Sequence, residues 1–238
     1  PTVFTYPIGT SGKYTPAVFT ISANGSTGSI RVNCINNHHP AVLDVSNVLN
    51  YYWEVEGTGI TGFSGSILLK YLASDVVGGP ESNYVAAQLL LPSTNWSKAA
   101  TGPSTDNVNE TNHTIIFNQT GSSNISGEYS AGNDPAFPTN IPQYTTNAPG
   151  NWNNPAIWTY TGGGAVYPCP ATGPNGFIVT INHEVTANVD YCFAYKTTIN
   201  SKLKMVAPRF GHNLGTVYGN GTLYLESAIF PAGRFDTF

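Results

Sequence analysis

The chain has 238 residues, which is enough to bury one large hydrophobic core or two smaller ones. Only 9% of the residues are charged, far below the roughly 25% of an average soluble domain, and the formal net charge is −4. Nine lysines and arginines, scattered along the chain, are too few to neutralise a run of phosphates, which argues against nucleic acid as a partner. Because no apolar run approaches the ~20 residues of a membrane span, we expect no such span.

Residues 1–132 show short apolar alternations separated by turn-forming Gly, Pro and Asn residues, and no stretch with a helical period. These alternations predict strands at residues 3–8, 17–22, 29–35, 51–56, 66–72, 84–91, 113–119 and 125–129. Eight short strands at this spacing predict an antiparallel β-sandwich of the immunoglobulin-like kind.

One of these strands alternates between a predicted core face and a predicted polar face. Tyr51, Trp53 and Val55 share one face, and we expect Trp53 to anchor the core. Glu54 and Glu56 share the opposite face. Two carboxylates on one face are the groups that glycan hydrolysis requires, but a solvated strand face explains the same pattern, and we expect no catalysis there.

Residues 133–150 carry four prolines, which remove backbone donors and fix extended backbone. We therefore expect a linker there, separating residues 1–132 from residues 151–238. Trp152 and Trp158 follow it, on either side of an Asn-Pro turn. We expect both rings to cover the first rung of a repeat structure; the alternative is an exposed platform on which sugar rings stack.

Three segments of the C-terminal part resemble one another: FIVTINHEVTA at residues 177–187, YKTTINSKLKM at residues 195–205 and GTVYGNGTLYL at residues 215–225. Their alignment brings Asn182, Asn200 and Asn220 into register, each followed by apolar residues two positions apart. A repeat of 18 to 20 residues predicts a β-solenoid, a stack of strand–corner–strand rungs. We expect the asparagines to form the corners in left-handed backbone and to bond to one another between rungs.

The three cysteines lack the spacing of a metal site, and no histidine lies at ligand distance along the sequence. Cys34 alternates with apolar residues and is expected to be a buried free thiol. Cys169 and Cys192 are candidates for a disulfide in an oxidising compartment, the alternative being two small buried apolar side chains. We expect no metal and no cofactor.

The chain begins at Pro1 without a leader-like segment, and it stops soon after the last repeat. These features predict a piece of a longer protein, or a subunit whose last rung is covered by another copy. Seven Asn-X-Ser/Thr sequons are candidates for glycosylation, although a chain rich in these residues produces many by chance. They lie at Asn24, Asn95, Asn109, Asn112, Asn118, Asn124 and Asn220.

Four segments resemble parts of very large secreted proteins of Bacteroidetes: FTYPIGTSGKYTP at residues 4–16, YYWEV at residues 51–55, GNWNNPAIW at residues 150–158 and VTINHEVT at residues 179–186. Those proteins are cell-surface or matrix proteins, many of them type IX secretion cargo, and they combine immunoglobulin-like modules with β-helical segments. The resemblance implies an extracellular or cell-surface location and an adhesive or structural role. It implies no catalytic residues, and the C-terminal sorting domain of such proteins is not found in this chain.

The sequence thus predicts an all-β chain, an immunoglobulin-like sandwich followed by the capped start of a β-solenoid. The first functional hypothesis is a non-enzymatic structural or adhesive segment of a large bacterial surface protein. The second is a subunit of an extracellular filament or sheath, and the third is a module that binds or modifies carbohydrate. The expected partners are other copies or segments of the parent surface protein, and glycans.

Overall fold

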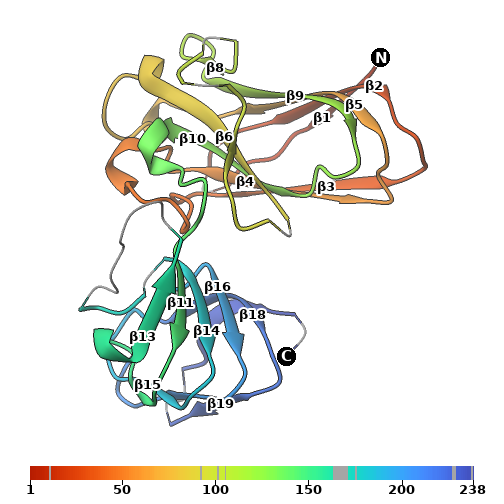
Figure 1. The fold of residues 1–238 in the computed structure, drawn as a ribbon. Coiled ribbons are helices and arrows are strands. Elements are labelled where there is room, and N and C mark those ends of the chain that lie inside the picture. The colour runs from red at the N-terminus through yellow and green to blue at the C-terminus, as the bar shows by residue number, and fades with distance from the viewer. Residues whose placement is uncertain are drawn as a thin grey trace. The chain divides into compact units, whose positions relative to one another are not determined.

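The computed structural model describes residues 1–10, 12–91, 93–100, 102–104, 106–162, 171–174, 176–226, 229–236 and 238. The fold is all-β, as the sequence predicts, and it divides into two compact units, Pro1–Thr139 and Asn140–Phe238 (Figure 1). The described helices are 3-10 turns of three residues: η1 (Val45–Asn47), η2 (Ala73–Asp75), η3 (Glu81–Asn83), η4 (Asp134–Ala136) and η5 (Pro155–Ile157).

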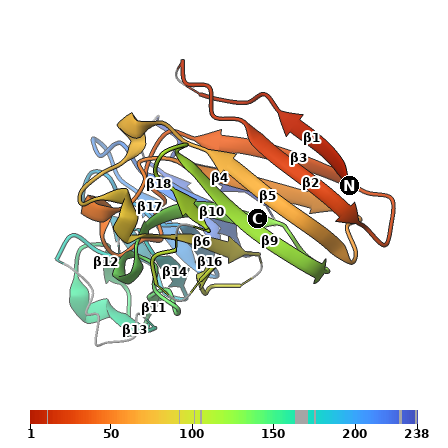
Figure 2. The same ribbon diagram turned by 90° about the horizontal axis from the view of Figure 1, so that it is seen from above.

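The first unit consists of two five-stranded antiparallel sheets, with strand orders β1-β2-β5-β9-β8 and β3-β4-β10-β6-β7 (Figure 2). Its strands are β1 (Thr2–Tyr6), β2 (Ala17–Ala23), β3 (Ser29–Ile35), β4 (Tyr52–Thr58), β5 (Phe63–Lys70), β6 (Tyr84–Leu90), β7 (Ser97–Lys98), β8 (Val108–Asn109), β9 (Thr114–Ser122) and β10 (Gly127–Asn133). All eight predicted strands are present. The two that the sequence missed, β7 and β8, have two residues each, which is too short for an alternation to be visible.

The core of the first unit draws on both sheets. Phe19, Ile67 and Phe117 come from the first sheet and Trp53 and Tyr129 from the second, all with at most 1% of their surface exposed. The core face predicted for residues 51–56 is confirmed, because Tyr51, Trp53 and Val55 are buried in this cluster. Burial of large aromatic and aliphatic side chains between the sheets is the main favourable contribution to the stability of this unit.

The second unit contains two sheets whose strands are almost all parallel. One has the order β13-β11-β14-β16-β18-β20, in which only the β13–β11 pair is antiparallel, and the other has the order β12-β15-β17-β19. Figure 1 shows the strands of the first of these sheets side by side. Its strands and those of its partner sheet are β11 (Gln143–Thr146), β12 (Gly150–Asn151), β13 (Trp158–Thr161), β14 (Ile178–Ile181), β15 (Val185–Ala187), β16 (Lys196–Ile199), β17 (Lys202–Met205), β18 (Asn213–Tyr218), β19 (Thr222–Leu225) and β20 (Ala232–Phe235).

The three sequence repeats pair in the predicted register. Val185 lies opposite Leu203, and Leu203 lies opposite Leu223, across three parallel strands. Val185 and Leu203 are fully buried, whereas Leu223 and Leu225 on the edge strand β19 are only half-buried. Each rung therefore buries its inner face against its neighbours, as the two-residue alternation predicted.

The predicted linker at residues 133–150 is wrong as a description of that segment. Ala136 and Phe137 are buried in the first unit, and β11 and β12 form a rung of the second, paired in parallel with β14 and β15. The prolines lie before and after β11, so the proline-free segment QYTT is able to join the sheet. The repeat structure consequently begins before residue 151, and the units divide inside the segment, between Thr139 and Asn140.

The predicted conformation of the asparagine corners is also wrong. Among the described residues the non-glycine positions with positive φ are His113 and Tyr191, so Asn182, Asn200 and Asn220 do not adopt left-handed backbone. Glycine serves the third corner instead: Gly219 has φ +115°, and a Cβ there would lie 2.1 Å from the carbonyl oxygen of Ile199. The corner needs glycine because two rungs approach each other so closely.

Candidate binding surface

Three exposed aromatic rings meet on the loops that connect the rungs of the second unit. Tyr191 and Phe193 follow β15, and Phe210 lies in the equivalent loop after β17. Their side chains are 51%, 39% and 43% exposed. The ring centroids of Tyr191 and Phe210 are 5.2 Å apart, and those of Tyr191 and Phe193 are 6.2 Å apart. These three residues are called the aromatic cluster below.

Backbone hydrogen bonds between successive loops hold this cluster in place. Tyr191 N donates to Phe210 O at 2.9 Å, and Ala194 N donates to Asn213 O at 2.9 Å. Tyr191 has φ +56°, a conformation that is unusual for a bulky side chain, and its ring lies against Gly211. A Cβ at Gly211 would come within 2.5 Å of that ring. The rings are thus positioned by fixed backbone, which lowers the entropy lost when they contact a partner.

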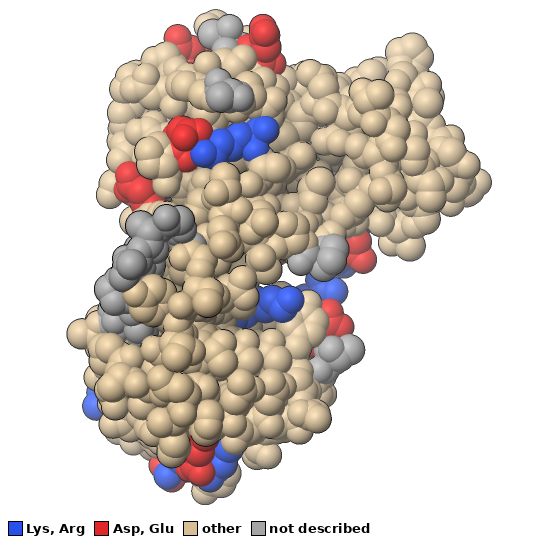
Figure 3. Space-filling model, in the orientation of Figure 1, with Lys and Arg blue, Asp and Glu red and all other residues tan. Residues whose placement is uncertain are grey.

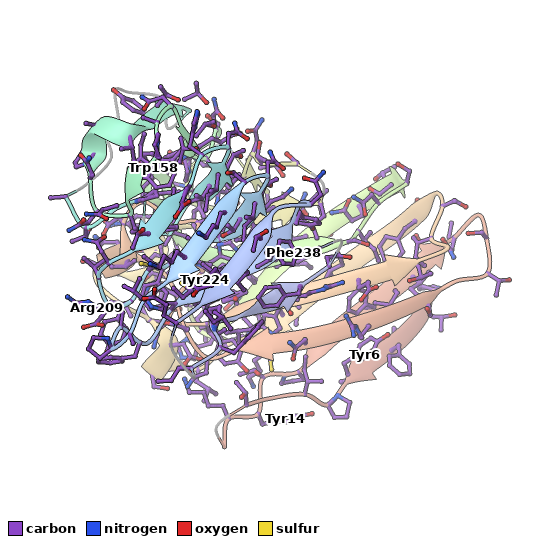
Figure 4. All side chains as sticks on the ribbon, turned by 90° about the horizontal axis from the view of Figure 1, so that it is seen from below. Tyr6, Tyr14, Trp158, Arg209, Tyr224 and Phe238 are labelled. Carbon is purple, nitrogen blue, oxygen red and sulfur yellow. The ribbon has the colours of Figure 1, made fainter. Side chains whose placement is uncertain are left out.

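A carboxylate and a guanidinium border the cluster. Asp190 Oδ1 accepts a hydrogen bond from Phe210 N at 3.2 Å, and Asp190 Oδ2 lies 3.6 Å from Arg209 Nη1. Both side chains are partly exposed, and Figure 4 shows Arg209 on a loop at the margin of the second unit. The surface therefore combines aromatic faces with donor and acceptor groups at their edge. This combination suits a ligand that has both C–H faces and hydroxyl groups.

Two buried groups lie beneath the cluster. Cys192 N donates to His212 Nδ1 at 3.3 Å, so this nitrogen is unprotonated in the folded chain. Burial lowers the pKa of His212, and the nearby Asp190 carboxylate opposes part of that decrease. Burial raises the pKa of the Cys192 thiol to about 12, which keeps it protonated at neutral pH and unsuited to nucleophilic attack.

Charged side chains on the outer face of the β12-β15-β17-β19 sheet surround a tyrosine on its edge strand. Lys202 Nζ lies 3.2 Å from Glu184 Oε1 and 5.2 Å from the ring centroid of Tyr224, and Lys204 Nζ lies 2.7 Å from Glu226 Oε1. Tyr224 is 45% exposed and is labelled in Figure 4. Because each lysine is already paired, this face is a weaker candidate for a charged ligand than the aromatic cluster. Figure 3 shows how sparse charges are on one side of the molecule.

Trp152 and Trp158 do not form an exposed platform. Their side chains are 0% and 5% exposed, their ring centroids are 5.6 Å apart at 74°, and Trp158 Nε1 donates to Trp152 O at 3.0 Å. Trp152 N also donates to Thr186 O, which joins the segment to β15. The sugar-stacking alternative is therefore wrong, since neither ring offers a face to a ligand. The expected covering role agrees with β13, which begins at Trp158 and pairs antiparallel with β11.

The asparagine corners form part of the predicted hydrogen-bond stack. Asn200 Nδ2 donates to Asn182 Oδ1 at 2.9 Å. All three side chains are exposed, and no amide bond between Asn200 and Asn220 occurs among the described residues. The stack therefore stabilises an outer corner and contributes no ligand site.

The cysteine predictions have different outcomes. Cys34 is a buried free thiol, as expected, and Cys192 is also buried and free. Cys169 lies outside the described residues, and Cys192 has a free thiol in the structure, so the bridge expected between them in an oxidising compartment is not observed here and stays a prediction.

Glu54 and Glu56, the two carboxylates considered for catalysis, interact with side chains on β3. Asn33 Nδ2 donates to Glu54 Oε2 at 3.1 Å, and Arg31 Nη2 lies 2.5 Å from Glu56 Oε2. Within the described ranges no three His, Cys, Asp or Glu side chains are grouped so as to hold a metal ion. None of the helices in the described part of the chain is long and apolar enough to cross a membrane.

Sequence reasoning did not identify the aromatic cluster, although a signal for it exists. Tyr191 and Phe210 lie in equivalent gaps between repeats, 19 residues apart, where a solvent-facing loop would ordinarily carry polar residues. Comparisons of the chain with protein-family models, with curated proteins and with solved structures find no match. The functional proposal is therefore based on the geometry of the aromatic cluster.

Proposed function

We propose that the chain is a non-enzymatic adhesive and structural segment of a large bacterial surface protein, extracellular in location and of the kind found in Bacteroidetes. In this proposal the first unit is an immunoglobulin-like sandwich that acts as a spacer. The second unit is the start of a β-solenoid that carries the binding surface. The low charge of the chain and its Ser-, Thr- and Asn-rich composition support an extracellular location.

The exposed aromatic cluster is the observation that carries the proposal. The Tyr191 ring contacts those of Phe193 and Phe210, and each of the three rings remains at least 39% exposed. Scattered exposed apolar residues are common on protein surfaces, but contiguous rings on a fixed backbone usually mark an interaction site. The Asp190–Arg209 pair at their edge supplies hydrogen-bonding groups. Glycans of a cell surface or matrix fit this surface, because sugar rings present C–H faces to aromatic rings and hydroxyl groups to charged side chains.

The test is binding of the purified chain to an array of bacterial and host glycans, followed by an affinity measurement on the best ligand. The variant Tyr191→Ala/Phe193→Ala/Phe210→Ala is expected to weaken binding at least about tenfold, since a few anchor residues, often aromatic, carry most of the binding energy of an interface. The matched control is Phe4→Ala/Tyr14→Ala, which removes exposed rings from the first unit and is expected to leave affinity unchanged. Equal affinity of the chain and the triple variant for every glycan bound would contradict the proposal.

Self-assembly is a second candidate function, supported by the edge strand β19. Leu223 and Leu225 on this strand are half-buried, whereas the residues opposite them on β17, Leu203 and Met205, are at most 1% exposed. An edge strand with apolar inner residues is able to accept a strand of another copy. Concentration-dependent filaments in electron micrographs, abolished by Leu223→Lys, would favour a filament or sheath subunit. A chain that stays monomeric at all concentrations would exclude this candidate.

A further inference from the structure

A lysine, an amide and a carboxylate meet at one end of the first unit. Lys13 lies in the segment between β1 and β2, Asn36 directly follows β3, and Asp75 is the last residue of η2. Lys13 Nζ lies 2.5 Å from Asn36 Oδ1 and forms an ion pair with Asp75 Oδ1. Since 23 and 62 residues separate Lys13 from these two partners, only the tertiary fold brings the three groups together.

The carboxylate of this group is withdrawn from water. The Asp75 side chain is 0% exposed and the Lys13 side chain is 19% exposed. Asp75 Oδ2 accepts a hydrogen bond from Leu72 N at 2.9 Å, which fixes the orientation of the carboxylate. The ring of Tyr51, which is itself buried, lies 5.4 Å from Lys13 Nζ, and its hydroxyl lies 2.6 Å from Thr15 Oγ1. Asn36 lies at the exposed side of the group.

We propose that Lys13 and Asn36 form an intramolecular isopeptide bond and that Asp75 transfers the protons. The arrangement supplies a nucleophilic nitrogen, a carboxamide carbon one bond away from the oxygen that the nitrogen contacts, and a fixed acid–base group. Asp75 is paired with the lysine and acts as the proton carrier, so it is not also the group that the lysine attacks. The Asn36 carboxamide is therefore the electrophile.

The reaction needs no co-reactant. Asp75 takes a proton from the Lys13 ammonium, and the freed electron pair of Nζ forms a bond to Asn36 Cγ while the carbonyl π pair moves to Oδ1. The intermediate then collapses and the Cγ–Nδ2 bond breaks. The leaving nitrogen receives one proton from Nζ and the proton held by Asp75, and it departs as ammonium. The products are one secondary amide, one ammonium ion and the original Asp75 carboxylate, so atoms and charges balance.

The bond would link the two sheets covalently. Lys13 precedes β2 in the β1-β2-β5-β9-β8 sheet, and Asn36 follows β3 in the β3-β4-β10-β6-β7 sheet. A covalent connection between sheets removes conformational freedom from the unfolded chain and resists separation of the sheets under force. This consequence does not depend on whether the aromatic cluster binds glycans.

The test is the intact mass of the folded full chain, combined with a tryptic map. We expect a mass lower than that of the sequence by one ammonia, and a tryptic species in which peptide 1–31, uncut at Lys13, is joined to peptide 32–70. The variants Lys13→Arg, which keeps a cation beside Asp75, and Asn36→Ala are each expected to show the full mass of their sequences. Circular dichroism verifies that both variants are folded.

The matched control is Lys98→Arg. Lys98 has the same 19% side-chain exposure and pairs with Asp134 at 2.7 Å. This variant should retain the ammonia loss and the joined peptides. The full sequence mass in the folded wild-type chain would overturn the proposal, as would an ammonia loss that persists in Lys13→Arg, because a succinimide at another asparagine would then account for it. Loss of water with a bond between Lys13 and Asp75 would overturn the assignment of Asn36.

Discussion

The two units of this chain reach an all-β fold through opposite patterns of strand pairing. In residues 1–139 strands far apart in sequence lie side by side, as where Trp53 on β4 faces Tyr129 on β10. In residues 140–238 most pairs join successive rungs, as where Leu203 lies 18 residues after Val185. Non-local pairing makes the first unit a single cooperative structure, whereas a stack of rungs is stabilised mainly by nearest-neighbour contacts. Substitutions should therefore act globally in the first unit and locally in the second.

The largest effect is expected for Trp53→Ala. Trp53 is fully buried between the two sheets, and removing such a ring costs about 3–5 kcal/mol. Chemical denaturation followed by hydrogen exchange should show the strands of residues 1–139 losing protection together while β14 to β18 keep theirs. Loss of protection confined to β4 would contradict the expected cooperative unfolding of the first unit.

Leu203→Ala should have the next largest effect, and it is best measured beside Leu223→Ala. Leu203 is buried between two neighbouring rungs, so its truncation should cost about 2–5 kcal/mol. Leu223 is half-buried on the edge strand, so its truncation should cost about 1 kcal/mol. Equal losses in unfolding free energy for the two variants would contradict nearest-neighbour stacking in the second unit.

Acidification should destabilise the second unit through His212. The pKa of this histidine is lowered in the folded chain, so the unfolded chain binds more protons as pH falls through the unperturbed value of about 6.5. The contribution of His212 to stability is therefore complete well above that value and is lost progressively as the pH falls through it toward the lower pKa of the folded state. Protonation of Nδ1 would also break the hydrogen bond from Cys192 N. Thermal unfolding of the chain and of His212→Asn across this range measures the effect; an identical pH dependence in both would contradict it.

The smallest effect is expected for Asn200→Ala. Its amide bond to Asn182 is exposed at the corner, so its loss should cost at most about 1 kcal/mol. Hydrogen exchange of the amides at Ser201 and Thr222 should increase locally, with the rest of the unit unchanged. Unfolding of the whole stack in this variant would show that the corner asparagines have a far larger role than their exposure implies.

The sequence predicted most strands because alternation and repetition are local patterns. The register of Val185, Leu203 and Leu223 follows from the repeat alone. The prolines of residues 133–150 predict a linker, but they do not interrupt the short segment around Tyr144, which forms β11. The aromatic cluster and the Lys13–Asn36–Asp75 group were not predictable in this way. The members of the Lys13–Asn36–Asp75 group lie up to 62 positions apart, for which a single sequence has no periodic signal. Tyr191 and Phe210 lie in equivalent gaps of the repeat, but their exposure and contact depend on how the loops fold.

The burial of the tryptophan pair is another feature that the sequence alone does not decide. The sequence left Trp152 and Trp158 open between a cover of the first rung and a sugar platform, because both functions use paired aromatic rings. Burial decides between them, and burial depends on the neighbouring rung, where Thr186 O accepts the hydrogen bond of Trp152 N. The exposed rings of the aromatic cluster lie instead on the loops between rungs.

The most direct test of the proposed function is the affinity of the full chain for a surface glycan, measured for the wild type and for the triple alanine variant of Tyr191, Phe193 and Phe210. Both proteins should be folded, which thermal unfolding checks, because the three side chains are between 39% and 51% exposed and lie outside the core. The proposal predicts an affinity reduced at least about tenfold in the triple variant, as expected when aromatic contact residues are removed. Unchanged affinity in a folded triple variant would contradict a binding role for the second unit.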